Sequence, residues 1–544
     1  MAQKPSSARS FARARGIPES NLRAWTQRLN TLNLSPTAVA FFTSEEGLRL
    51  LHLILCAAVY VIVVRLNAGP RRVCEFLELS TLSSLVTSSH GTIAAFSERM
   101  LDRVIELGNT EEDRLAKGAS PKDITLSPDE TYHKGAPVLI SIEPVSGYSV
   151  VEKVASNCES VTWKVATSNF LEKVPFRVIQ QTHDGSKALK NYTEKGLSAH
   201  LSPDLMHLMA PLHRAISRPL GKQVQTAEVR LEATREQVAA REAAKAADKT
   251  YVPGVPGLAY DLWIKQAEND VKQAEESRRS AIENLDSART LINSLSTDYH
   301  PFDLKTGALR SASQLEASLT ATFDQLSELA TKTVLTDKSK QALWSARKAA
   351  IEPMVKTLTF YHEQQTLRLA QADLHEPSRQ AMVAHWLPGE YLLMAASKET
   401  DSAKRYELKE RGEELLASLA DADSVVMALA QSERSRLAEV VKSCLDVFQR
   451  SSSCTEGRNG QVELQHHSLR GLPPKRLEAQ RVLHNFHIKR PDGTTAAERL
   501  FGQKPRSLYE YVVEHLTPLG FPARRRQRVM PRPFWSEPVA GDEG

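Results

Sequence analysis

The feature that most constrains the fold is a segment of about 240 residues, 210–450, in which apolar residues recur with a helical period almost throughout. Within it, residues 223–248 and 260–295 are long, charged and rich in alanine, and the sequence TYVPGVPG separates them. This pattern predicts an antiparallel hairpin of long, coiled-coil-like helices. No unit of 20 to 50 residues repeats, which excludes a solenoid. We therefore expect a large helical domain in the middle of the chain.

The pattern before this segment is that of strands. "ITLSPDETY" and "PVLISIEPVSGYSVVEKV" contain alternating, β-branched runs, separated by turns at Lys134-Gly135 and Ser146-Gly147. A helix, a strand ending at residues 183–185, a second helix and a last strand in "AHLSPDLMHLM" follow. The order strand, strand, strand, helix, strand, helix, strand predicts a mixed sheet, with three antiparallel strands followed by parallel ones.

Residues 1–115 are helical in pattern and contain a possible DNA-reading element. Ser88 or Ser89 is placed to cap a helix that runs from His90 to Arg99 after a short helix and a turn. This arrangement predicts a helix-turn-helix, although an ordinary helical hairpin fits equally well. The candidate DNA contacts in this segment are Ser88, Ser89, His90, Thr92 and Arg99.

Positive charge is concentrated at the two ends of the chain. The net charge of the 544 residues is only +5, yet both termini are strongly basic and have few acids. Such segments favour binding to a polyanion such as DNA. The basic residues are Arg9, Arg13, Arg15, Arg23 and Arg28 in the N-terminal arm, and Arg524, Arg525, Arg526, Arg528 and Arg532 in the tail.

Cysteine usage and hydropathy indicate a cytoplasmic protein. The five cysteines form no CxxC pair, so neither a disulfide framework nor a thiolate zinc site is supported. The most apolar run, residues 53–64, has 12 residues, too few to span a bilayer, and predicts a buried helix. No secretory signal is expected, and no membrane partner.

Three acids are candidates for metal chemistry. Asp129 lies on or just beyond the first predicted strand and Asp184 ends the fourth, so the two carboxylates are expected side by side. Glu456, in "SSSCTEGRNGQ", is the candidate third acid on a later helix. Its structural alternative is a capping box with Ser453. Clustered carboxylates favour hard divalent cations such as Mg²⁺, and two ions about 4 Å apart would serve phosphodiester displacement.

Five segments resemble bacterial insertion-sequence transposases with an RNase H-like fold. "SPDETYHKGAPVLISIEPVSGY" resembles their first catalytic block, "QQTHDGSKAL" the second, "LSPDLMH" their Asp-x-x-His strand, and "SSSCTEGRNG" the third block. "HNFHIKRPDGTTAAERLFGQ" is similar to the C-terminal segment of a transposase-like family. The resemblance implies an RNase H-like core interrupted by the helical insertion.

The resemblance also implies roles for single residues. It makes Asp129, Asp184 and Glu456 the catalytic, metal-binding triad, with two Mg²⁺ ions for which Mn²⁺ can substitute. The spacings are 55 and 272 residues, so the helical insertion lies between the second and third acids. The glycines after Glu456 would let its helix approach the sheet closely. Pro128 departs from the pattern of a central strand, so we expect the first strand to be short.

The implied domains are a helical DNA-binding region (1–115), two parts of the RNase H-like core (120–210 and 451–520), the insertion (211–450) and a basic tail (521–544). The implied activity is cleavage and strand transfer of double-stranded DNA by a homo-oligomer associated with the nucleoid. Two alternatives stay open: a catalytically inactive DNA-binding descendant, and an RNase H-like nuclease without strand transfer.

Five further residues are secondary candidates. Glu130 is expected on the opposite strand face from Asp129 and to be structural. Glu143 is the main rival of Asp129 and should face away from the triad. Asp204 and His207 match the Asp-x-x-His strand, although a core histidine is the commoner outcome for such a residue. Arg458, one helical turn from the metals, is a candidate phosphate contact.

Overall fold

The computed structural model describes residues 36–248, 259–420, 424–468 and 471–519. It divides into two compact units, Met1–Gly118 with Gln461–Gly544 and Ala119–Gly460. The first division lies near the predicted boundary at 115, and the second divides the predicted segment 451–520. The basic residues predicted to bind DNA at both termini, Arg524, Arg525, Arg526 and Arg528 among them, lie outside the described residues, as does TYVPGVPG.

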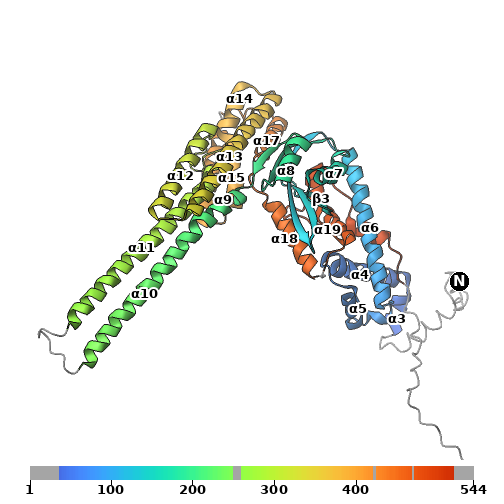
Figure 1. Cartoon of the computed structure of the whole chain (residues 1–544). Coiled ribbons are helices and arrows are strands. Elements are labelled where there is room, and N and C mark those ends of the chain that lie inside the picture. The colour runs from blue at the N-terminus through green and yellow to red at the C-terminus, as the bar shows by residue number, and fades with distance from the viewer. Residues whose placement is uncertain (1–35, 249–258, 421–423, 469–470, 520–544) are drawn as a thin grey trace, which may run out of the picture. The chain divides into compact units, whose positions relative to one another are not determined.

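The unit Ala119–Gly460 contains a five-stranded mixed sheet (Figure 1). The spatial order is β3-β2-β1-β4-β5. β1, β2 and β3 pair antiparallel, whereas β4 is parallel to β1 and β5 is parallel to β4. The predicted mixed sheet is therefore confirmed. The strands are β1 (Lys122–His133), β2 (Ala136–Glu143), β3 (Tyr148–Val154), β4 (Phe176–His183) and β5 (His200–Pro203).

The β1–β2 turn has the geometry that its residues favour. Lys134 and Gly135 both have positive φ, 51° and 83°, as a two-residue primed hairpin requires. The expectation of a short first strand is wrong, because β1 has 12 residues. Pairing between β1 and β4 ends at Leu126, so Pro128, two residues further on, does not have to donate a hydrogen bond to β4.

Helices cover the two faces of the sheet. On one face, the Phe170 ring of α7 (Ser160–Leu171) packs against Tyr148 of β3 and Phe176 of β4. On the other face lies the start of α18 (Ser453–Ser468), whose Arg458 pairs with Glu152 of β3. The connection between β4 and β5 contains α8 (Lys187–Asn191) and a π-helical turn (Tyr192–Leu197).

The segment between β5 and α18 is helical, as predicted, and has a hydrophobic core of its own. That core begins at Leu205 and ends at Phe448, so it includes the helix that directly follows β5. The helices are α9 (Leu205–Leu212), α10 (Arg218–Ala247), α11 (Tyr260–Asp298), α12 (Ala312–Lys332), α13 (Asp337–Gln371), α14 (Glu376–Ala381), α15 (Leu387–Lys398), α16 (Ser402–Ala420) and α17 (Gln431–Leu445), with π-helical turns at His213–Ser217 and Met382–Trp386.

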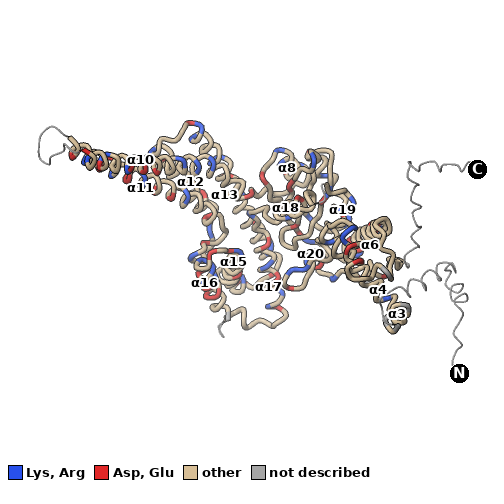
Figure 2. The backbone as a smooth tube through the Cα atoms, turned by 90° about the horizontal axis from the view of Figure 1, so that it is seen from below, with Lys and Arg blue, Asp and Glu red and all other residues tan. Residues whose placement is uncertain are grey.

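α10 and α11 form the predicted antiparallel hairpin and lie side by side (Figures 1 and 2). Three ion pairs join them: Glu228 with Arg278, Arg235 with Glu275, and Lys245 with Asp261. Residue numbers rise along α10 while they fall along α11, which establishes the antiparallel direction.

The other unit is helical in its described residues. Its helices are α3 (Pro36–Thr43), α4 (Glu45–Val59), α5 (Pro70–Leu79), α6 (His90–Lys117), α19 (Pro474–Phe486), α20 (Ala496–Phe501) and α21 (Leu508–Glu514), with short helical turns at Tyr60–Arg65 and Leu82–Ser84. Buried acids of α6 are paired with arginines of the C-terminal segment: Glu111 with Arg506, and Glu112 with Arg481.

The predicted recognition helix begins where expected but is much longer. Ser89 is its N-cap and accepts a hydrogen bond from the Thr92 N–H at 3.3 Å, while Ser88 precedes it. The helix continues to Lys117 instead of ending near Arg99, because its apolar residues keep a helical period and are buried as far as Ala116. His90 and Arg99 are exposed. The helix-turn-helix itself stays a prediction.

The apolar run 53–64 belongs to a longer helix than predicted. α4 and the π-helical turn after it form one helix of 21 residues, Glu45–Arg65, which by length and composition alone would be able to cross a membrane. A helix buried in a protein core can have the same length and composition. The Tyr60 ring packs against Tyr509 and His487, and Gln480 Nε2 donates to the Val64 carbonyl at 2.5 Å. One side of this helix therefore packs within its unit.

Candidate functional site

The register of β1 and β4 brings Asp129 and Asp184 to the same level. Leu126 pairs with Gln181 across the two parallel strands. Asp129 lies three residues after Leu126, and Asp184 three residues after Gln181. Because both strands run in the same direction, the two aspartates stand at the same edge of the sheet and share a face. Their predicted proximity thus follows from the strand pairing.

A buried histidine holds the loop that carries Asp184. His183, the last residue of β4, accepts a hydrogen bond from the Gly185 N–H at its Nδ1 (3.0 Å). Its Nε2 then carries the proton and lies 3.0 Å from the Thr193 hydroxyl. Burial lowers the pKa of His183 to about 4, so the ring is neutral. Asp184 remains exposed, and its Oδ1 accepts from the Ser186 N–H at 2.9 Å.

The third acid, Glu456, lies in the first turn of α18. The capping-box alternative is wrong, since the Ser453 N–H donates to the Ser451 hydroxyl and the Glu456 N–H donates to the Ser452 carbonyl. The helix is fixed instead by Thr455, whose hydroxyl donates to the Ser127 carbonyl of β1 at 2.7 Å. Glu456 itself is exposed.

Two neighbours of Glu456 attach α18 to one row of residues across the sheet. Asp129 of β1 pairs with Ile140 of β2, which pairs with Glu152 of β3, so the three share a face. Asn459 Nδ2 donates to Asp129 Oδ2 at 2.7 Å, and Arg458 forms a bidentate pair with Glu152 at 2.8 and 2.9 Å. α18 therefore lies over this row.

These contacts correct two predictions. Arg458 is only 3% exposed and pairs with Glu152, so it is not available as a phosphate contact. Gly457 and Gly460 do not bring the helix close to the sheet, because a Cβ added at either position would meet no atom within 4 Å. They lie instead on the open side of α18, beside Glu456.

The electrostatics show that acids are crowded around Asp129. Burial raises the pKa of Asp129 to about 6, and the negative charges of Asp184 and Glu456 contribute. Burial also raises the pKa of Glu130 to about 7, with contributions from Asp129 and Asp184. The ionised forms of these carboxyl groups therefore disfavour one another. A bound cation would relieve their repulsion.

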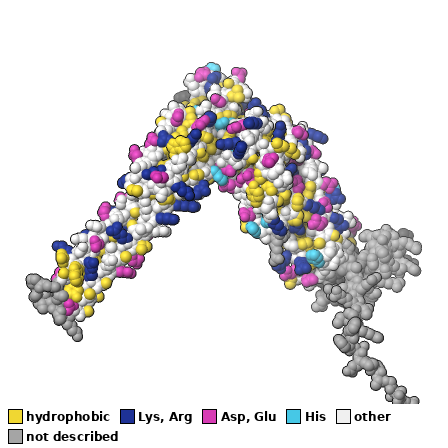
Figure 3. All heavy atoms as spheres, in the orientation of Figure 1, with side chains coloured by type: hydrophobic (Ala, Val, Ile, Leu, Met, Phe, Trp, Pro, Cys, Tyr) yellow, Lys and Arg dark blue, Asp and Glu magenta, His cyan; other side chains and the backbone are white. Residues whose placement is uncertain are grey.

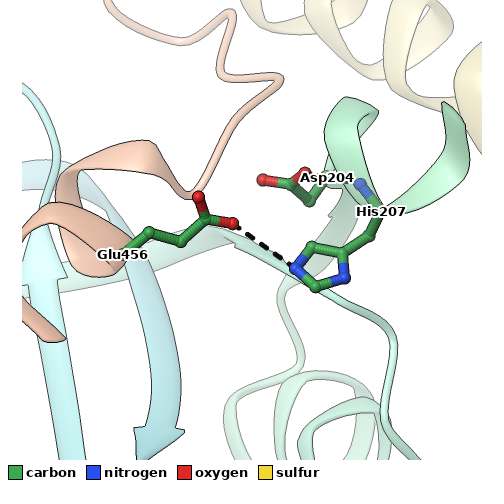
Figure 4. Close-up of side chains that lie close together, drawn as sticks. All are labelled: Asp204, His207 and Glu456. Carbon is green, nitrogen blue, oxygen red and sulfur yellow. Dashed lines mark hydrogen bonds and ion pairs between the residues drawn. The ribbon is translucent and has the colours of Figure 1, made fainter. Parts of the chain in front are cut away.

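A second group of potential ligands includes Glu456. The ligand atoms of Asp204, His207 and Glu456 all lie within 4.8 Å of one another. His207 Nε2 is 3.4 Å from Glu456 Oε1, and Figure 4 shows these two side chains pointing toward one another from α9 and α18. Asp204 and His207 were expected on a strand, but β5 ends at Pro203 and they lie at the start of α9.

Asp204 has a structural role that competes with metal binding. It is the N-cap of α9, and its Oδ1 accepts from the His207 N–H at 3.0 Å. Its Oδ2 accepts from both the N–H and the hydroxyl of Ser452, at 2.5 and 2.6 Å. The residue is 1% exposed. Asp204 thus ties the end of the sheet to the segment that leads into α18.

The two remaining acids have different surroundings. Glu143 is buried, and its carboxylate accepts from the Val145 and Ser146 N–H groups, which closes the turn between β2 and β3. By strand alternation it faces away from Asp129, as predicted. Glu130 pairs with Leu139 on the face opposite Asp129. Its Oε2 is buried and has no hydrogen-bond partner within the described residues.

Four residues of the site were not predicted: Asn459, Glu152, Ser452 and His183. Only His183 carried a signal, because it stands next to Asp184. The other three act through partners that are 248 to 330 residues away in the sequence. Polar residues such as these are recognisable only once their partners are known.

Replacing Asp129 with Asn should stabilise the metal-free protein at alkaline pH. The pKa of this carboxyl is 3.8 when unperturbed and about 6 here, so its stability penalty grows as the pH rises from 4 to 6. The gain should approach about 3 kcal/mol above pH 6, since one pKa unit corresponds to roughly 1.4 kcal/mol. Asn459 can accommodate the change by turning its amide, whose buried Oδ1 has no partner in the described part of the chain.

Thermal unfolding in EDTA at pH 4.5 and pH 8 measures this gain. Added Mn²⁺ should raise the unfolding temperature of the wild type more than that of the variant. A variant less stable than wild type at pH 8 in EDTA would show that the ionised Asp129 carboxylate does not destabilise the folded protein.

Comparison with known proteins adds one finding for this part of the chain. A family of unknown function, DUF6399, matches residues 382–528. The matched segment contains Glu456, Arg458 and Asn459 but neither Asp129 nor Asp184, and it covers about a quarter of the chain. No curated protein matches the sequence.

Proposed function

We propose that this protein is a DNA transposase that cleaves and joins DNA strands with divalent metal ions held by Asp129, Asp184 and Glu456. One observation carries the proposal: Asp129 and Asp184 lie at the same level of two neighbouring parallel strands, and Glu456 opens a helix whose Thr455 is hydrogen-bonded to β1. The strand order and directions are those expected of an RNase H-like core.

The donor set fits hard divalent cations. All three side chains offer carboxylate oxygens, the ligands that Mg²⁺ and Mn²⁺ favour, and Asp184 and Glu456 are exposed. Burial raises the pKa of Asp129 to about 6 and the charges of Asp184 and Glu456 add to this effect, so a bound cation would favour its ionised form. When bound, a pair of such ions would activate the attacking oxygen and stabilise the leaving oxygen of a phosphodiester.

The chain's own residues orient these ligands. Asn459 holds Asp129 through Oδ2, and the Glu130 N–H holds it through Oδ1 at 2.9 Å. The loop braced by His183 presents Asp184. The Arg458–Glu152 pair keeps α18 on the sheet, so that Glu456 projects from its open side. The space beside Gly457 and Gly460 would admit a DNA backbone next to Glu456.

The proposed metal site competes with an alternative centred on His207. The group Asp204, His207 and Glu456 offers one imidazole and two carboxylates, but the oxygens of Asp204 already accept three hydrogen bonds. We propose that His207 restrains Glu456 in the absence of metal. When a metal ion is bound, Asp129 and Asp184 would be its other protein ligands beside Glu456.

An assay on DNA tests the function directly. The purified full chain is incubated with duplex DNA that carries the ends of its own genetic element, with Mg²⁺ or with EDTA. We expect nicking at the ends and joining of the new 3′-hydroxyl to target DNA, both only with Mg²⁺. Nicking without joining would favour an RNase H-like nuclease, and DNA binding without nicking would favour an inactive, DNA-binding descendant.

A further inference from the structure

An unusual row of basic residues runs along the start of the α10–α11 hairpin. Arg214, Arg218, Lys222 and Arg230 are all exposed. Arg214 lies in the π-helical turn before α10, and the other three follow at spacings of four, four and eight residues. Four residues of an α-helix exceed one full turn by about 40°, so the four positions form a row that slants round the helix. We call these four residues the basic row. In Figure 3, dark-blue side chains gather over this part of the helical segment.

The basic row differs from the other cations of the same hairpin. Arg235 and Lys245 of α10 pair with acids of α11, and Arg241 donates to the Trp263 carbonyl. Within the described residues, no member of the basic row forms an ion pair or a side-chain hydrogen bond. These charges therefore do not hold the hairpin together.

Nearby acids do not neutralise the basic row. Between residues 214 and 230 the sequence has one acid, Glu228, and it pairs with Arg278 of α11. Glu276 of α11, which lines the same hollow as Lys222 and Arg230, pairs with Arg279. Figure 2 shows basic and acidic positions mixed along the hairpin, so the unbalanced charge is local to this stretch.

Lys222 and Arg230 also border an open hollow of about 700 Å³ between α10 and α11. Ser280 and Asn284 line its α11 side and provide a hydroxyl and an amide. Neither side chain forms a hydrogen bond within the described residues. A phosphate is recognised by this combination of cations and neutral donors. No aromatic ring lines the hollow, as far as the structure describes it, so a base-stacking platform for single strands is lacking.

We propose that the basic row is a binding surface for the phosphate backbone of duplex DNA, apart from the acidic site. The row spans 16 residues, or about 24 Å at 1.5 Å per residue. A duplex presents one phosphate per strand for roughly every 3.4 Å of its axis, so the row reaches along about seven base pairs. Only the choice of DNA over double-stranded RNA rests on the proposed function. The helical insertion thereby takes part in holding DNA.

The test compares salt dependence of binding in EDTA, where no metal chemistry takes place. The probe is a fluorescent 40-base-pair duplex of random sequence, and binding is read by anisotropy between 50 and 200 mM salt. The variant Arg218→Gln/Lys222→Gln/Arg230→Gln should lower the slope of log affinity against log salt by about 2.7, and affinity at 0.1 M salt by roughly a hundredfold. The control Arg379→Gln/Lys404→Gln/Lys409→Gln removes the same charge from exposed positions of α14 and α16 and should change neither.

Further variants and probes keep the result interpretable. The variant Arg218→Lys/Arg230→Lys keeps the charge and should keep the wild-type slope, which separates electrostatic loss from misfolding. An unchanged slope in the triple variant, or equal losses in both triple variants, would overturn the proposal, as would an effect confined to a double-stranded RNA probe. A lower salt slope of DNA binding in the triple variant, found although the wild type shows no nicking, is a further outcome. That result would support the basic row as a DNA-binding surface and reject the proposed function.

Discussion

Asp184→Asn should reduce Mg²⁺-dependent nicking on the order of a thousandfold while DNA affinity stays within about threefold of wild type. The substitution removes one negative charge from the metal site but keeps an oxygen that can accept from the Ser186 N–H. The loop after β4 should therefore keep its shape. Single-turnover nicking at an element end, with binding measured in EDTA, separates the two effects.

Asp492→Asn is a matched control for this variant. Asp492 also accepts a hydrogen bond from the N–H two residues ahead, at 2.8 Å from Thr494, but it lies in the other unit. Its replacement should leave nicking unchanged. Glu456→Gln should behave as Asp184→Asn does, because it removes the charge of an exposed carboxylate and leaves the hydrogen bond from its N–H to the Ser452 carbonyl intact. Wild-type activity in either site variant would remove that residue from the triad.

Arg458→Ala should destabilise the attachment of α18 by about 3–5 kcal/mol and abolish nicking, because it leaves Glu152 buried without its arginine. The chain has two units, so global unfolding does not report this contact cleanly. Hydrogen exchange of the α18 and β3 amides, followed by mass spectrometry, is the suitable measurement. We expect protection to fall in both segments.

A double variant controls for the buried charge. Arg458→Met with Glu152→Leu replaces the ion pair with apolar side chains of similar size, and it should restore most of the protection. DNA affinity in this double variant should equal that of wild type. Normal protection in Arg458→Ala together with weaker DNA binding would instead support the phosphate contact that the sequence suggested for Arg458.

The sheet and its two aspartates were predictable because their signals are local. Alternating β-branched residues mark the strands, and Lys134-Gly135 is a turn that needs only its own residues. The order of strands and helices then makes the first and fourth strands neighbours. The 55-residue offset of Asp129 and Asp184 equals that of the paired Leu126 and Gln181, so the level of both acids follows from the strand register.

The surroundings of Glu456 were not predictable in the same way. Its helix returns to the sheet after an insertion of more than 200 residues, and nothing in the local sequence says which of its sides faces β1 and β3. Burial of Thr455 and Arg458 settles that question and turns Gly457 and Gly460 to the open side. For this reason two predictions were wrong: that Arg458 contacts a phosphate, and that the glycines let the helix approach the sheet closely.

Helix ends were also poorly predicted where the sequence has no clear stop. α6 continues from the expected start at His90 to Lys117, since its apolar period persists past Arg99. The apolar run 53–64 extends backward to Glu45, where Ser44 caps the helix by accepting from the Gly47 N–H. In both cases polar residues on the exposed side interrupt the apolar sequence, so the sequence alone does not show that the helix is continuous.

Anomalous diffraction from crystals soaked in Mn²⁺ would locate the metal of the proposed site without depending on activity. We expect a Mn²⁺ peak bordered by the carboxylates of Asp129, Asp184 and Glu456, and no such peak in crystals of Asp184→Asn. A peak held by Asp204, His207 and Glu456, with none beside Asp129 and Asp184, would contradict this expectation.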